Sequence, residues 1–129
     1  MKKILLLLLL LISVSVFSQD QPYYLRAHNL SFGVRKTQGE PIDWIHQKQE
    51  CSILVECYKT KLIINSKDPQ TYHILYQTFF EDNKQSWKCR DVVGSTCNVE
   101  MTSDPQYPGF LSVLVEYDDM IWFYICTKN

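Results

Sequence analysis

The residues whose type and spacing could do chemistry are two cysteines in the stretch WKCRDVVGSTC, residues 87–97. Cys89 and Cys97 lie on either side of a segment that contains Gly94 and is typical of a turn. Two thiols so placed can form a structural disulfide, pack as small buried side chains, or form a strained bond that acts as a redox switch. A zinc site needs four well-placed ligands, and no second cysteine pair follows this one. We therefore predict no metal site and no cofactor.

The first 18 residues have the pattern of a secretory signal peptide. Lys2 and Lys3 precede an uninterrupted apolar run from residue 4 to residue 12, and Val16 and Ser18 match the small residues before a cleavage site. The run is too short and too early for a stable membrane span. We expect cleavage after Ser18, a single secreted or periplasmic domain over residues 19–129, and no membrane span after cleavage.

The charge balance excludes two classes of partner. Loss of Lys2 and Lys3 with the leader leaves 11 basic and 14 acidic side chains, a net charge of about −3. No basic run is longer than the pair at Arg35 and Lys36. Nucleic acid and anionic membranes require a cationic surface, so neither is expected as a partner.

Export favours oxidation of cysteines, and the mature chain has five, at positions 51, 57, 89, 97 and 126. Because five is odd, at least one stays unpaired or pairs between chains. Cys51 and Cys57 are too far apart to bond if the chain between them is extended. Cys89 and Cys97 are the disulfide candidate, because a three-residue turn would place them opposite each other. The remaining pairing is open.

Apolar residues recur with a period of two from about residue 52 onward, which indicates half-buried β-strands. Short turns at Lys59-Thr60 and Asp118-Asp119 would join these strands into hairpins. These turns give registers in which the apolar residues of two paired strands lie on the same face of the sheet. The expected pairs are Val55 with Ile64, Cys57 with Leu62, Trp87 and Cys89 with Val99 and Cys97, Val113 with Tyr124, and Val115 with Trp122. Residues 71–80 predict a further strand, ended by a polar loop over residues 81–86.

The pattern is weaker before residue 52. Residues 30–35 resemble a short strand, and residues 40–50 indicate a loop with a helical turn after Pro41. The strands and turns together predict an all-β fold, a small antiparallel meander of seven to eight strands. Such a meander forms a closed or partly open barrel, which we favour because closure removes sheet edges, or a two-sheet sandwich.

The leader ending in FSQ, followed by CSILVECYKTKLIINSKDPQTYHI, CRDVVGSTCNVEM and LVEYDDMIWFYI, resembles small secreted proteins of Gram-negative bacteria to which no function is assigned. The resemblance covers most of the mature chain and rests on spacing and turn chemistry. It implies a bacterial secreted β domain and supplies no catalytic residues.

Other groups that could do chemistry are dispersed. The three histidines, His28, His46 and His73, have no ligand spacing to one another, and no nucleophile or zinc-protease motif occurs. Acidic residues gather at turns, where aspartate is common, and they lack the ligand order of a calcium loop. No catalytic residue is predicted, and the chain is not expected to be an enzyme.

Aromatic residues make up 13% of the chain. We expect them to fill the interior, in particular Trp87, Trp122 and Tyr124 together with Val113 and Val115. A secreted, non-enzymatic interaction or cell-envelope module, with an unidentified protein as its partner, is then the first functional expectation. If the aromatics instead line a cavity, the alternative is a carrier of a small hydrophobic ligand inside a β-barrel. The sequence leaves the oligomeric state open.

Overall fold

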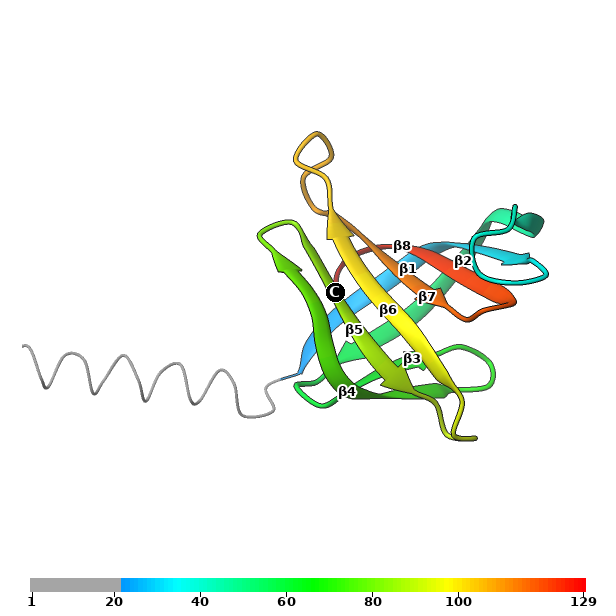
Figure 1. Cartoon of the computed structure of the whole chain (residues 1–129). Coiled ribbons are helices and arrows are strands. Elements are labelled where there is room, and N and C mark those ends of the chain that lie inside the picture. Colours follow the sequence, from blue (N-terminus) through cyan, green and yellow to red (C-terminus); the bar gives the residue numbers. More distant parts are fainter. Residues whose placement is uncertain (1–21) are drawn as a thin grey trace, which may run out of the picture.

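The structure, a computed structural model, describes residues 22–129, which form a closed β-barrel (Figure 1). Its eight strands are β1 (Tyr23–Val34), β2 (Asp43–Cys57), β3 (Lys61–Asn65), β4 (Gln70–Glu81), β5 (Lys84–Arg90), β6 (Thr96–Ser103), β7 (Phe110–Glu116) and β8 (Met120–Lys128). They pair antiparallel in sequence order, and β8 returns to β1. The prediction of an all-β barrel is confirmed, and the sandwich is excluded. The predicted leader and its cleavage site lie outside the described residues.

The hairpins have the registers that the alternation predicts. The pairs are Val55 with Ile64, Cys57 with Leu62, Trp87 with Val99, Cys89 with Cys97, Val113 with Tyr124 and Val115 with Trp122. In the β5–β6 turn the amide of Asp91 donates to the carbonyl of Ser95 at 2.9 Å, which closes a three-residue loop. Gly94 has a φ of +93°, a conformation that residues with a Cβ atom rarely adopt. The sequence and the turn chemistry therefore set the same register.

One end of the barrel, which we call the closed end, carries the β1–β2, β5–β6 and β7–β8 connections and is plugged by side chains. Trp122 stacks on Phe32 with ring centroids 4.8 Å apart and meets the edge of Tyr117 at 5.9 Å. Arg35 covers the β7–β8 turn with a side chain only 5% exposed, and its guanidinium contacts the carboxylate of Glu116 at 3.1 Å. These rings pack against one another inside this end of the barrel, and a polar pocket of about 270 Å³ borders Tyr117 beside the β7–β8 turn.

Before residue 52, the strand expected over residues 30–35 is present but longer than predicted, and the loop expected over residues 40–50 is wrong. β1 begins at Tyr23, well before the short strand expected from residue 30. The segment expected to be a loop with a helical turn is instead the first half of β2, which pairs with β1 from Asp43 onward. Its side chains are exposed on both faces, so they show no alternation. A strand that extends beyond the core has no buried face, so its sequence lacks the apolar alternation by which a strand is recognised.

The polar segment after β4 is also shorter than expected. Only Asp82 and Asn83 form the turn, because Glu81 already pairs with Lys84. β4 itself is interrupted by two register shifts, between residues 74 and 76 and between residues 77 and 79. The hairpin of β4 and β5 therefore continues to the opposite end of the barrel from the plug.

Closure of the barrel depends on a short ladder. β3 pairs with β4 only from residue 70 to residue 73, and one further backbone bond joins the amide of Ile74 to the carbonyl of Thr60 at 2.8 Å. Beyond it, residues 75–81 of β4 pair with β5 alone. Contrary to our expectation, closure does not remove every edge, because this part of β4 has a free one.

Candidate functional site

A cavity of about 360 Å³ occupies the barrel at the end opposite the plug, which we call the open end. The open end carries the start of β1, the β2–β3 and β4–β5 turns, and the β6–β7 loop (Figure 1). The volume lies at the lower limit of small-molecule sites and corresponds to roughly a dozen non-hydrogen atoms. The cavity can therefore hold one small ligand.

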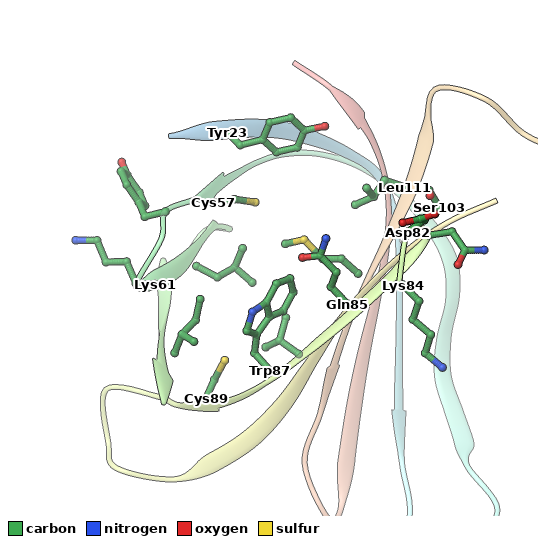
Figure 2. A pocket seen from close by; sticks show the side chains of 16 residues that line it. Tyr23, Cys57, Lys61, Asp82, Lys84, Gln85, Trp87, Cys89, Ser103 and Leu111 are labelled. Atoms are coloured by element: carbon green, nitrogen blue, oxygen red, sulfur yellow. The ribbon is translucent and has the colours of Figure 1, made fainter. Parts of the chain in front are cut away.

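The wall of the cavity is mostly apolar, because alternate residues of the strands point inward. Its deep part consists of side chains from β3 to β7, namely Leu62, Ile74, Trp87, Cys89, Val99, Met101 and Leu111. Figure 2 shows Trp87 and Gln85 projecting from β5 into this space, with Cys57 and Tyr23 across from them. Among residues 22–129 no polar or charged residue is fully buried. The site is built to remove an apolar molecule from water.

Charged side chains stand at the rim and do not enter the cavity. Lys61 and Lys84 belong to the lining but point away from its centre (Figure 2). The ammonium of Lys61 lies 5.2 Å from the ring centroid of Tyr58, and that of Lys84 lies 3.6 Å from a carboxylate oxygen of Glu100. Asp82, the third charged residue of the lining, belongs to the β4–β5 turn at the rim, so the deep part of the cavity carries no fixed charge.

Two thiols line the cavity, and neither is activated. Burial raises the pKa of Cys57 from 9.0 to about 12. Burial, with the nearby Cys97 as a smaller cause, raises the pKa of Cys89 to about 12. At neutral pH both groups are protonated thiols, which are poor nucleophiles and poor metal ligands. They contribute apolar surface to the wall.

The disulfide candidates lie where the sequence places them. Cys89 and Cys97 are directly opposite on β5 and β6, at a position where Cα atoms are about 5.5 Å apart, within the range that a disulfide spans. All five cysteines are thiols in this structure, including the half-buried Cys51 and Cys57 and the buried Cys126. The bridge is compatible with the register and stays a prediction.

Histidines and carboxylates do not gather into a site. Within residues 22–129 no three His, Cys, Asp or Glu side chains are arranged to hold a metal ion. His28 shares a hydrogen bond with Thr127 at 2.7 Å, and His73 is exposed on β4. In this part of the chain no helix is long and apolar enough to cross a membrane.

Asp91 has a structural role that its place in a turn does not reveal. It accepts hydrogen bonds from the amides of Val93 and Ser95, and from the hydroxyl of Tyr117 at 2.7 Å. Burial acts to raise the pKa of Asp91, but these hydrogen bonds outweigh it and lower the pKa below its ordinary value. The ionised carboxylate fixes the β5–β6 turn onto the plug at the closed end.

No protein family, no curated protein and no solved structure matches this chain. The resemblance to secreted bacterial proteins stays a prediction.

The expectation of a filled interior is confirmed at one end of the barrel and wrong at the other. Val113, Val115 and Tyr124 are buried in the core, and Trp122 belongs to the plug. Trp87 is half-buried and borders open space. The alternation predicts that these side chains point inward, but it carries no information about the room between them.

Proposed function

We propose that the protein binds a small, mostly apolar molecule inside its barrel and carries it, without transforming it chemically. The observation that supports this function is the cavity of about 360 Å³, apolar in its depth, accessible at one end and closed at the other by an aromatic plug. No activated nucleophile or metal cluster adjoins it among the described residues. Binding is the activity that such a site performs.

The test uses 2-isopropylnaphthalene, a rigid hydrocarbon of about the size that the cavity admits. We expect isothermal titration calorimetry to give a one-to-one complex with a Kd of roughly 10 µM, a typical value for a ligand of a dozen atoms held by apolar contacts. Replacement of Met101, an inward residue of the cavity wall, by tryptophan fills this space and should weaken binding at least about tenfold.

Two further variants make the result interpretable. Val93→Trp adds the same side chain at an exposed position of the β5–β6 turn, on the closed end, and should leave the Kd unchanged. Leu111→Trp blocks the cavity from β7 and should act like Met101→Trp if the latter folds poorly. Absence of binding by the folded wild-type protein, or equal binding by all four proteins, would refute the carrier function.

A second function, the interaction module expected from the sequence, is favoured by the free edge of β4. Residues 75–81 lack a partner strand on one side and expose four large apolar side chains, Leu75, Tyr76, Phe79 and Phe80. Natural proteins usually protect such edges with lysine or proline. This edge suits an extended peptide segment of a partner protein, which would add a strand to the sheet.

Selection from a library of displayed extended peptides tests this second function. We expect the wild-type protein to enrich sequences of alternating apolar residues, and Tyr76→Lys and Phe80→Lys to lose at least about nine-tenths of the bound peptide because a charge blocks the edge. Tyr107→Lys, at an exposed position of the β6–β7 loop, should retain binding. Peptides that bind all three variants equally, or a library that yields none, would argue against this use of β4.

A further inference from the structure

The polar groups that enter the cavity are few, and all of them are uncharged. Gln85 directs its side-chain amide into the space between Cys57 and Trp87 (Figure 2). Trp87 follows two residues later on the same face of β5, so the two side chains leave the strand about 7 Å apart. Each supplies an N–H donor within a wall that is otherwise apolar.

These donors have no side-chain hydrogen-bond partner in the part of the chain that the structure describes. Among the side-chain hydrogen bonds of residues 22–129, none involves the amide of Gln85 or the indole N–H of Trp87. In the same residues every fully buried side-chain nitrogen or oxygen is hydrogen-bonded. The two unpartnered groups are therefore accessible from the cavity, where a ligand could pair with them.

The lining discriminates against an anionic ligand. A carboxylate inside the barrel would need a cation, because burial of an unpaired charge is costly. Lys61 is directed toward the ring of Tyr58, while Lys84 is placed between Glu100 and the ring of Phe79. Their ammonium groups are engaged at the rim, so the donors that reach the interior are neutral.

We propose that the ligand is a neutral, mostly apolar molecule with a carbonyl-type oxygen, and that this oxygen accepts a hydrogen bond from the side-chain amide of Gln85. The apolar body of the ligand then lies against Trp87 and Met101, in the deep part of the cavity. This inference depends on the carrier function and adds the chemical class of the ligand to it.

Three test ligands of nearly equal size separate the alternatives: 2-isopropylnaphthalene, methyl 2-naphthyl ketone and 2-naphthoate. They carry a hydrocarbon, a carbonyl and a carboxylate on the same ring system. We expect the wild-type protein to bind the ketone roughly fivefold to tenfold more tightly than the hydrocarbon, the contribution of one hydrogen bond to a neutral group. The carboxylate should bind more weakly than either.

Gln85→Met keeps the length of the side chain and removes its hydrogen-bonding groups. This variant should bind the ketone and the hydrocarbon with similar affinity and should retain the hydrocarbon affinity of the wild type. Gln77→Met, which makes the same change at an exposed position of β4, should preserve the preference for the ketone. The matched pair isolates the effect of an amide inside the cavity.

Each outcome has a distinct meaning. A wild-type protein that binds the hydrocarbon but shows no preference for the ketone would overturn this inference and leave the carrier function intact. A preference for the ketone that survives Gln85→Met, or tightest binding of the carboxylate, would overturn it as well. If none of the three ligands binds, the carrier function fails and this inference fails with it.

Discussion

Replacement of Trp122 by alanine should lower the free energy of unfolding by about 3 kcal/mol or more. The indole connects two other aromatic rings of the plug, with centroids 4.8 Å away in Phe32 and 5.9 Å away in Tyr117. Its loss leaves a void that neighbouring strands of a closed barrel cannot easily fill. A domain of this size is stable by roughly 5 to 15 kcal/mol, so the effect is a large fraction of the total.

Urea denaturation followed by far-ultraviolet circular dichroism measures this effect. Phe80→Ala is the control, because Phe80 is 67% exposed and its truncation should change stability by no more than about 0.5 kcal/mol. Similar losses in the two variants would mean that the closed end is not a packed plug. The barrel would then have two accessible ends.

The reduced protein should lose stability steeply above pH 9. Burial raises the pKa of Cys57, Cys89 and Cys126 from 9.0 to about 12, and that of Cys97 to about 11. Below pH 9 these thiols are protonated in both the folded and the unfolded chain, so their contribution is fully present. Above pH 9 only the unfolded chain releases its protons readily, so rising pH favours unfolding.

The size of this effect follows from the number of thiols. Each raised thiol costs about 1.4 kcal/mol of stability per pH unit above pH 9, so four of them cost about 6 kcal/mol at pH 10. Burial also raises the pKa of Tyr72 and Tyr124, which adds to the loss above pH 10. Alkaline unfolding should therefore begin within about two pH units above pH 9, the ordinary pKa of the thiols.

The same measurement of stability against pH also tests whether the predicted Cys89–Cys97 disulfide forms. In an oxidised sample with a Cys89–Cys97 disulfide, two of the four thiols are absent and the loss at pH 10 should fall to about 3 kcal/mol. Cys57→Ala removes one thiol without touching this pair and should reduce the loss in reductant by about a quarter. Stability that stays constant from pH 8 to pH 10 in reductant would contradict the burial of these thiols.

Much of the barrel could be predicted from the sequence, because its inward face is regular. Inward residues of β5 to β8 alternate without interruption, and the short turns at Lys59-Thr60 and Asp118-Asp119 admit only one register. The alternation of apolar residues and the length of a turn are local properties, so they can be recognised without knowledge of the rest of the fold. The cysteine pair opposite each other at Cys89 and Cys97 follows from the same logic.

The parts that could not be predicted depend on what surrounds a strand. The first half of β2 is exposed on both faces, and the end of β4 contains two register shifts, so neither has a period of two. The cavity depends on how far the inward side chains reach across the barrel. Gln85 shares a face with Trp87, but the sequence does not show that this face borders open space.

A crystal structure of the protein with 2-isopropylnaphthalene tests the central claim most directly. The carrier function predicts ligand density inside the open end of the barrel, in contact with Trp87, Met101 and Leu111, with the plug around Trp122 unchanged. A structure in which these side chains close over the cavity, or in which the ligand lies only on the outside of the barrel, would contradict it.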